Sequence, residues 1–281
     1  MTVEQWLKYA KQQLTTAGSS SPAIDAEVLL LSVLDKPRSY LFTWPDKALT
    51  ATQSDQLQVF LSRRLSGEPV AYITGVREFW SLPLQVAPST LIPRPDTERL
   101  VELALQKLPS SGGDVLDLGT GTGAVALALA SERPDCQLTG IDLQPEAVSL
   151  AKSNATALSI ENATFLQGSW YSPLQDGTKF AVIVSNPPYI DPDDEHLTQG
   201  DVRFEPLSAL IADKQGMADI EWIAEQGRCH LSDGGWLMFE HGYDQGPLAR
   251  DCLTALGYCD VVTEQDYAGH DRVTMGCWKG L

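Results

Sequence analysis

The stretch Asp117-Leu118-Gly119-Thr120-Gly121-Thr122-Gly123 is the clearest indication of fold class in this sequence. An apolar run at 115–118 has the composition of a buried strand, and a second apolar run at 124–130 has that of a buried helix. The glycines between them permit a tight turn and let a ligand approach the backbone closely. We therefore predict the first strand–loop–helix unit of a parallel sheet, with a ligand-binding loop at the carboxyl end of its strand.

Segments typical of strands and of helices alternate after this loop. Further strands are predicted at 138–142, 164–166, 181–184 and 235–240, and a second helix at 145–158. Such alternation is typical of a parallel sheet with helices on both faces. The expected fold class is α/β, with a mainly parallel, Rossmann-like sheet.

The glycine loop has an acidic companion in Asp142, which ends the next predicted strand 19 positions after Gly123. A carboxylate there can hold two ribose hydroxyls, so the pair fits a nicotinamide dinucleotide or S-adenosylmethionine, while a tight turn without a ligand is a third interpretation. Asp117 favours S-adenosylmethionine, because a carboxylate at the strand end would repel a diphosphate but tolerate an aminoacyl group. Trp170 is expected either in the core or against an adenine face.

The loop Asn186-Pro187-Pro188-Tyr189 follows the predicted strand at 181–184. Neither proline has an N–H to donate, so the strand ends here. The side-chain oxygen of Asn186 and the carbonyl of Pro187 can accept both hydrogens of one planar –NH2 group, and Tyr189 offers that group a flat face. We predict a loop that holds an amide or amino nitrogen for reaction, which hydride transfer does not need.

Three regions are expected along the chain. Helical spacing of apolar residues predicts a small helical domain at 1–72, and the β-prone segment 73–92 predicts a hairpin-like linker to an α/β domain at 93–281. Residues 92–98, Ile-Pro-Arg-Pro-Asp-Thr-Glu, lead into a helix predicted from about residue 96 to 108. This stretch is either a plain interdomain linker or a loop that borders the active site.

The charge of the chain argues against a nucleic-acid partner. The formal net charge is −17, so no cationic excess is present to release counterions from phosphate. We interpret the compact basic pair Arg63-Arg64 as a solvated helix face.

The cysteines and histidines predict neither a metal site nor a disulfide framework, because they are scattered along the chain, the cysteines at 136, 229, 252, 259 and 277. No apolar run is long enough for a spanning helix, and the N-terminal residues lack the pattern of a signal peptide. A reducing cytoplasm is the expected location. Nothing in the sequence demands a dimer, so a monomer is expected.

The loops at 117–123 and 186–189, with Asp142 and Trp170, together resemble the class I methyltransferases that act on planar nitrogens. Four further segments narrow the resemblance to the peptide chain release factor N5-glutamine methyltransferases, the PrmC or HemK family. They are 75–84, 91–98, Phe204-Glu205-Pro206 and 266–273, and the resemblance covers nearly the whole chain. Two positions depart from the family pattern: Ser169 stands where an acid is common, and His270 where an arginine is common.

The resemblance implies a class I fold and methyl transfer from S-adenosylmethionine to the side-chain amide nitrogen (N5) of the glutamine in the Gly-Gly-Gln loop of bacterial release factors, which modulates translation termination. S-Adenosylhomocysteine would be the product, no metal would be needed, and the helical domain would dock the release factor. The implied cofactor-binding residues are Gly119, Thr120, Gly121, Thr122, Gly123, Asp142, Trp170 and Asn186. The implied glutamine-binding residues are Asn186, Pro187, Pro188 and Tyr189, of which Asn186, Pro187 and Tyr189 are the expected catalytic residues. Either Glu205-Pro206 forms a plain loop turn, or Phe204 and Glu205 line the substrate pocket.

Four alternatives remain open on the sequence alone. A DNA adenine N6-methyltransferase would use the same nitrogen-holding loop on a flipped base, but the net charge argues against it. A glutamine methyltransferase acting on a ribosomal protein would share the catalytic motif. A nicotinamide-dependent oxidoreductase would leave the loop at 186–189 unexplained, and a non-catalytic binding module would leave a full set of site residues unused.

Overall fold

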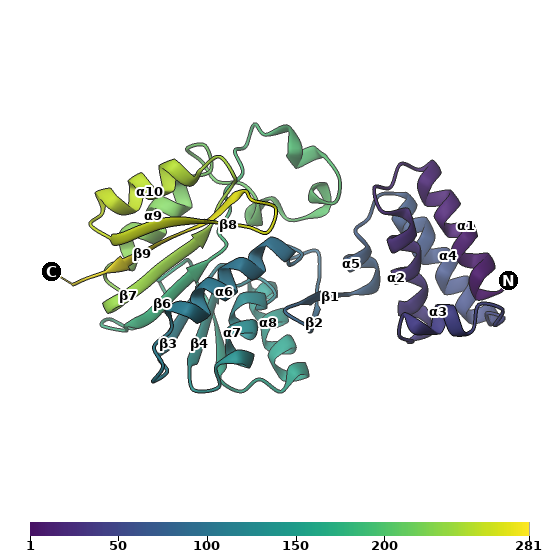
Figure 1. Ribbon diagram of the computed structural model, residues 1–281, viewed down its shortest axis with the longest axis horizontal. Coiled ribbons are helices and arrows are strands. Elements are labelled where there is room, and N and C mark those ends of the chain that lie inside the picture. Colours follow the sequence, from purple (N-terminus) through teal and green to yellow (C-terminus); the bar gives the residue numbers. More distant parts are fainter. Residues whose placement is uncertain (281) are drawn as a thin grey trace. The chain divides into compact units, whose positions relative to one another are not determined.

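The chain divides into two units, and the first is made of two separate stretches of sequence. The first contains Met1–Val76 and His196–Phe204, and the second contains Arg77–Glu195 and Glu205–Leu281. The computed structural model describes residues 1–280, without the side chains of Glu195 and His196 (Figure 1). The chain therefore leaves the first unit after Val76 and returns to it for nine residues in the middle of the second.

The first unit is helical, as the sequence predicts. Its elements are α1 (Val3–Thr16), α2 (Pro22–Leu34), α3 (Ser39–Thr43), α4 (Ala51–Leu65) and α5 (Val70–Thr74). Capping boxes start α1 and α4, where Thr2 and Thr50 exchange hydrogen bonds with Gln5 and Gln53. Apolar side chains from all five helices, among them Trp6, Leu29, Leu41, Leu57 and Ile73, form one buried core.

The predicted end of the helical region at residue 72 falls inside α5. The helix continues to Thr74 and stops at Gly75, whose φ of +77° gives the left-handed conformation that ends many helices. The following residues form the hairpin β1 (Val76–Phe79) and β2 (Leu82–Gln85), a separate two-stranded sheet. The predicted domains were consecutive segments of sequence, so residues 196–204 were placed in the α/β domain. In the structure they belong to the first unit.

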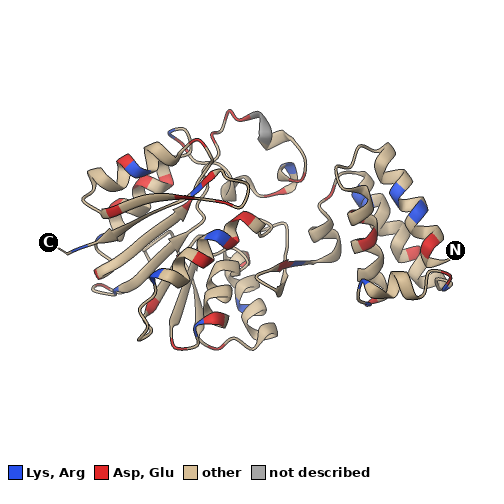
Figure 2. Cartoon of the chain, viewed as in Figure 1, with Lys and Arg blue, Asp and Glu red and all other residues tan. Residues whose placement is uncertain are grey.

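The interpretation of Arg63-Arg64 as a solvated face is wrong. Arg64 is only 11% exposed and bonds Asp25 Oδ2 at 2.8 Å and Asp201 Oδ1 at 3.0 Å, both within the first unit. Arg63 donates to Glu68 Oε2 at 2.7 Å. Figure 2 shows Lys and Arg interspersed with Asp and Glu on these helices. The partner Asp201 lies 137 positions away in the sequence, which is why helical spacing alone could not reveal the pairing.

The second unit is built on a seven-stranded sheet with the order β5-β4-β3-β6-β7-β9-β8. The strands are β3 (Asp114–Leu118), β4 (Gln137–Asp142), β5 (Ala163–Gln167), β6 (Phe180–Ser185), β7 (Leu231–Glu240), β8 (Cys259–Gln265) and β9 (Asp271–Trp278). The first five are parallel, whereas β9 runs antiparallel to both β7 and β8. The five strands predicted from the sequence are confirmed, and the antiparallel pair at the C-terminus was not predicted.

Helices cover both faces of this sheet (Figure 1). One buried cluster joins the sheet to α6 (Glu98–Lys107), α7 (Ala124–Glu132) and α8 (Pro145–Leu158), and another joins it to α9 (Ala218–Gly227) and α10 (Gly246–Ala255). Alternate residues of one strand serve opposite faces: Val115 of β3 belongs to the first cluster and Leu116 to the second. The doubly covered, mainly parallel sheet confirms the predicted fold class.

Short 3-10 turns complete the second unit and the segment inserted in it. They are η1 (Pro95–Thr97), η2 (Glu195–Thr198), η3 (Val202–Phe204) and η4 (Leu207–Ala209). The helix predicted from about residue 96 is thus a 3-10 turn followed by α6. In the described part of the chain, none of the helices combines the length and hydropathy that a bilayer-crossing segment requires.

Candidate active site

A cavity of about 260 Å³ lies in the second unit beside the carboxyl ends of β3, β4 and β6. In doubly wound sheets this edge is where ligands bind. The cavity brings together four groups that the sequence singled out separately: the glycine loop, Asp142, Trp170 and Asn186. Pro93, Arg94 and Thr97 also line it, so the stretch 92–98 borders this cavity and is not merely a linker.

The residues of the glycine loop have two roles: some line the cavity, and one allows close packing of the neighbouring helix. A Cβ added at Gly121 would meet no atom within 4 Å, so its backbone leaves open space, and Gly121 lines the cavity together with Gly119, Thr120 and Thr122. Gly123 is not among the lining residues, and a Cβ there would contact Leu127, Ala151 and Phe165 at 3.1–3.2 Å. Gly123 thus lets α7 pack closely on its neighbours, while the preceding residues form the cradle.

Asp142 ends β4 and is fixed by backbone donors. Its Oδ2 accepts from Gly121 N and its Oδ1 from Gln144 N, each at 2.9 Å. Each oxygen keeps a second lone pair, which suits it to accept from a ribose hydroxyl. Burial raises the pKa of Asp142, and the backbone donors oppose that rise.

Asp117 lies one strand over and is almost completely buried. Its Oδ2 accepts from Thr120 Oγ1 at 2.7 Å and from Ala126 N at 3.2 Å. Burial raises the pKa of Asp117 to about 6, although both hydrogen bonds oppose the shift. An anion at this edge of the cavity suits a cationic aminoacyl group better than a diphosphate, as the sequence suggested.

Trp170 fits both of the interpretations that the sequence left open. It lines the cavity next to Ser169, and it also packs against the buried cluster under α9. Its backbone has a φ of +50°, which is uncommon for a bulky residue. The cavity thus combines open backbone in the glycine loop, a carboxylate that can accept from ribose hydroxyls, and an aromatic face. These groups fit S-adenosylmethionine.

The loop after β6 is split between the cavity and the protein interior. Asn186 and Pro188 line the cavity, whereas Pro187 and Tyr189 are not among its lining residues. The hydroxyl of Tyr189 donates to Glu240 Oε1 at 3.1 Å. The structure thus gives Tyr189 a polar partner behind the loop, which the sequence analysis did not foresee.

Glu240 and Thr97 are site residues that the sequence analysis missed. Thr97 Oγ1 donates to Glu240 Oε2 at 2.6 Å, and Asn186 Nδ2 donates to Thr97 Oγ1 at 3.2 Å. Burial raises the pKa of Glu240, opposed by the hydrogen bond from Thr97, the charge of Arg272 and the hydrogen bond from Tyr189. A signal was available, because Glu240 ends the predicted strand at 235–240, as Asp142 ends its own.

Glu205 is buried but is not among the lining residues of the cavity. Its Oε1 accepts from Ile92 N at 3.2 Å and its Oε2 from Arg94 Nη2 at 2.7 Å. Neither expected role describes it, since it is neither a plain turn nor part of the pocket wall. It holds the segment that contributes Pro93 and Arg94 to the cavity.

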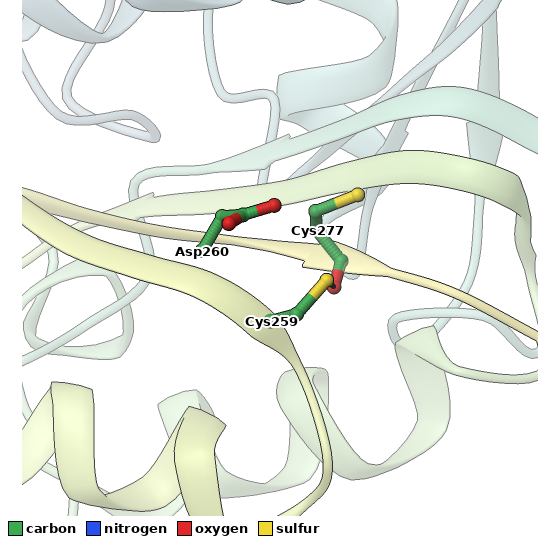
Figure 3. Close-up of side chains that lie close together, drawn as sticks. All are labelled: Cys259, Asp260 and Cys277. Carbon is green, nitrogen blue, oxygen red and sulfur yellow. Dashed lines mark hydrogen bonds between the residues drawn. The ribbon is translucent and has the colours of Figure 1, made fainter.

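Two of the cysteines are not as isolated as the sequence suggested. Cys259 and Cys277 face each other on β8 and β9, and their sulfur atoms lie within 4.8 Å of each other and of an Asp260 carboxylate oxygen (Figure 3). The Cys259 thiol donates to the Cys277 carbonyl at 3.2 Å, and Lys279 Nζ lies 3.9 Å from Asp260. The ammonium group opposes a second cation at this place.

Two family models match the chain in separate regions. The PrmC N-terminal domain matches residues 5–75, and the methyltransferase small domain matches residues 97–202.

Curated relatives match over nearly the full length. A release factor glutamine methyltransferase of Vibrio cholerae is 64% identical over 99% of this chain and 98% of its own. Enzymes of the same name are 56% identical in Aliivibrio fischeri, over 99% of this chain and 98% of the relative, and 55% identical in Escherichia coli, over 98% and 99%.

Solved structures agree on the fold alone. A methyltransferase from Pyrococcus furiosus has a TM-score of 0.55 at 20% identity and covers 78% of this chain and 98% of its own. A 16S rRNA N2 G1207 methyltransferase of T. thermophilus, in complex with AdoMet and guanosine, has a TM-score of 0.53 at 17% identity and covers 73% and 50%.

Proposed function

The chain belongs to the release factor glutamine methyltransferase family, and from this membership we propose that it transfers a methyl group from S-adenosylmethionine to the side-chain amide nitrogen of a glutamine in a release factor. The observation that carries the proposal is the shared cavity, which Asn186 lines together with the glycine loop and Asp142. A nitrogen-holding group and a cofactor cradle in one cavity fit a reaction between the two bound molecules.

The cofactor would be held by residues of three strand ends. Gly121 offers open backbone and Gly119 lines the cavity beside it. Asp142 would accept from the ribose hydroxyls, and Trp170 would cover the adenine. Gly123 supports the loop by close packing and is not proposed as a direct contact. When bound, S-adenosylmethionine supplies an electrophilic methyl group on a cationic sulfur.

Asn186 and Pro187 would hold the glutamine amide by its two N–H groups. An amide nitrogen is a poor nucleophile because its lone pair is delocalised into the carbonyl. Hydrogen bonds from –NH2 to the Asn186 Oδ1 and the Pro187 carbonyl would favour negative charge on nitrogen and would fix its direction. Pro188 would form the adjoining wall, and Tyr189 would support the loop through Glu240.

The partner proposed here is the Gly-Gly-Gln loop of a bacterial peptide chain release factor, docked by the helical unit. The net charge of −17 supports a protein partner in preference to a nucleic acid. A translation factor as substrate implies a cytoplasmic reaction, and one active site per chain requires only a monomer.

The test is mass spectrometry of a purified release factor after incubation with this protein and S-adenosylmethionine. One added methyl group on the Gly-Gly-Gln glutamine is the expected result. Asn186→Ala should lower turnover by about a hundredfold or more, while calorimetry still detects binding of S-adenosylhomocysteine. Methylation of a ribosomal protein but not of the release factor would overturn the proposed substrate, and an equal loss of cofactor binding would overturn the role of Asn186.

A further inference from the structure

Resting on the proposed function, we infer that Thr97 and Glu240 are positioning residues that set the orientation of the Asn186 amide, so that its oxygen faces the substrate nitrogen. The oxygen and nitrogen of an amide have nearly the same shape, and only hydrogen-bond partners distinguish the two orientations. A site that must accept from –NH2 therefore needs a device that prevents rotation of the Asn186 amide by half a turn.

The device is a chain of three side chains from distant parts of the sequence. Asn186 Nδ2 lies 3.2 Å from Thr97 Oγ1, which lies 2.6 Å from Glu240 Oε2. Thr97 is 4% exposed and Glu240 is 2% exposed, so water does not compete freely for these groups. Thr97 also lines the cavity beside Asn186.

The direction of each hydrogen bond follows from the chemistry of the last member. Glu240 accepts from Thr97 through Oε2 and from Tyr189 through Oε1, so the single hydroxyl hydrogen of Thr97 is used in its bond to Glu240. Thr97 Oγ1 then has only lone pairs left for Asn186, and these require the –NH2 end of the amide. The opposite orientation would set Asn186 Oδ1 against lone pairs and leave it without a donor, a costly state for a half-buried group.

This polarity has a consequence for substrate choice. With Oδ1 turned to the cavity, the site accepts hydrogens, as the –NH2 of glutamine requires. A glutamate carboxylate at the same place would set oxygen against oxygen. Glu240 therefore acts through Thr97 to favour glutamine over glutamate, although it is not among the residues that line the cavity.

The chain contains a matched control. Tyr189 also donates a hydroxyl hydrogen to Glu240, at 3.1 Å, but no hydrogen bond joins that hydroxyl to Asn186 among the described residues. Tyr189→Phe and Thr97→Val each remove one donor from the buried carboxylate, so both should lower stability. Only Thr97→Val also removes the acceptor of the Asn186 amide, and Thr97→Ser restores it.

The experiment compares wild type, Thr97→Ser, Thr97→Val and Tyr189→Phe. Binding of a Gly-Gly-Gln release factor and of its Gln→Glu variant is measured in the presence of S-adenosylhomocysteine. Wild type and Thr97→Ser should keep the preference for glutamine, and Tyr189→Phe should keep it whatever the effect of the lost loop support on turnover. Thr97→Val should lose about tenfold or more of that preference and about a hundredfold in kcat. Affinity for S-adenosylhomocysteine should stay within about threefold in all four.

A second readout needs no substrate. The side-chain –NH2 signals of Asn186, identified by their loss in Asn186→Ala, are followed by NMR hydrogen exchange. One hydrogen should exchange about tenfold faster in Thr97→Val only, because its acceptor is gone. Unchanged exchange in Thr97→Val, or an equal loss of glutamine preference in Tyr189→Phe, would overturn the inference. Failure of wild type to methylate any release factor would instead overturn the proposed function, and the exchange result would still decide the orientation.

Discussion

Arg94 donates to the buried carboxylate of Glu205 at 2.7 Å, and the pair connects segments 111 residues apart. The same carboxylate accepts from Ile92 N, so one side chain holds both the backbone and a side chain of the 92–94 segment. Two stretches that looked like separate motifs in the sequence are therefore parts of one support for the cavity wall.

Glu205→Ala should lower the free energy of unfolding by about 3 kcal/mol, because it leaves Ile92 N and Arg94 without their acceptor. Turnover should fall with it, since Pro93 and Arg94 line the cavity. Urea unfolding and steady-state kinetics measure the two effects. Glu205→Gln keeps one acceptor but sets its –NH2 group against the other donor, so its stability should fall between those of wild type and the alanine variant. Equal stability of the alanine variant and wild type would contradict the supporting role.

Asp117 should make the cofactor-free protein less stable as pH rises. Its folded pKa of about 6 lies above the reference value of 3.8, so the folded state holds the proton more tightly than the unfolded state. The free energy of unfolding of wild type relative to Asp117→Asn should therefore fall between about pH 4 and 6, by on the order of 3 kcal/mol. Denaturant titrations of both proteins across this range measure the difference. A difference that is flat or rises with pH would contradict it.

Gly121→Ala should mainly weaken cofactor binding, whereas Gly123→Ala should mainly lower the stability of the fold. Both glycines have positive φ, +54° and +82°, so either alanine costs about 1 kcal/mol of backbone strain. At Gly123 the new methyl group would also press on three side chains, which should lower the melting temperature clearly. At Gly121 it would project into the cavity and should mainly weaken binding of S-adenosylhomocysteine. Thermal unfolding and calorimetry separate the two, and a reversed order would refute the division of roles in the loop.

Arg64→Ala should destabilise the first unit far more than Arg63→Ala. Arg64 is 11% exposed and bonds two carboxylates, whereas Arg63 is 38% exposed. Loss of the buried arginine should cost about 3 kcal/mol and should speed proteolysis at 196–204, while loss of Arg63 should cost about 1 kcal/mol or less. Limited proteolysis with mass spectrometry locates the cuts. Similar cutting of both variants would show that Arg64 does not secure this segment.

Local sequence patterns were enough for the parallel part of the sheet. The glycine loop, the acid at the end of β4 and the prolines after β6 each act within a few residues of themselves, so spacing reveals them. Strand β8 escaped prediction because its residues show no regular alternation and Asp260 interrupts it with a φ of +53°. Strand β9 is buried without a break from Val273 to Trp278, so it shows no alternation either. The parallel strands therefore follow from composition, and the antiparallel pair does not.

The sequence predicted the site residues that face the cavity themselves. It did not predict the residues that act on the site through hydrogen bonds to other side chains. Asn186, Asp142 and Trp170 were identified because their chemistry suits a ligand. Glu240 was marked only by its place at the end of a predicted strand, and the roles of Thr97 and Glu240 arise from hydrogen bonds that span 89 and 143 positions. Sequence patterns of one chain carry no record of such distant pairs.

The return of residues 196–204 to the first unit limits how this protein can be recombined. A chimera that takes its N-terminal helices from another relative at a junction near Val76 would bring a foreign partner to Asp201. Arg64 of the native helices would be lost from that ion pair, and the incoming helices would meet a segment selected for different neighbours. A chimera that exchanges the first unit must therefore replace residues 1–76 and 196–204 together.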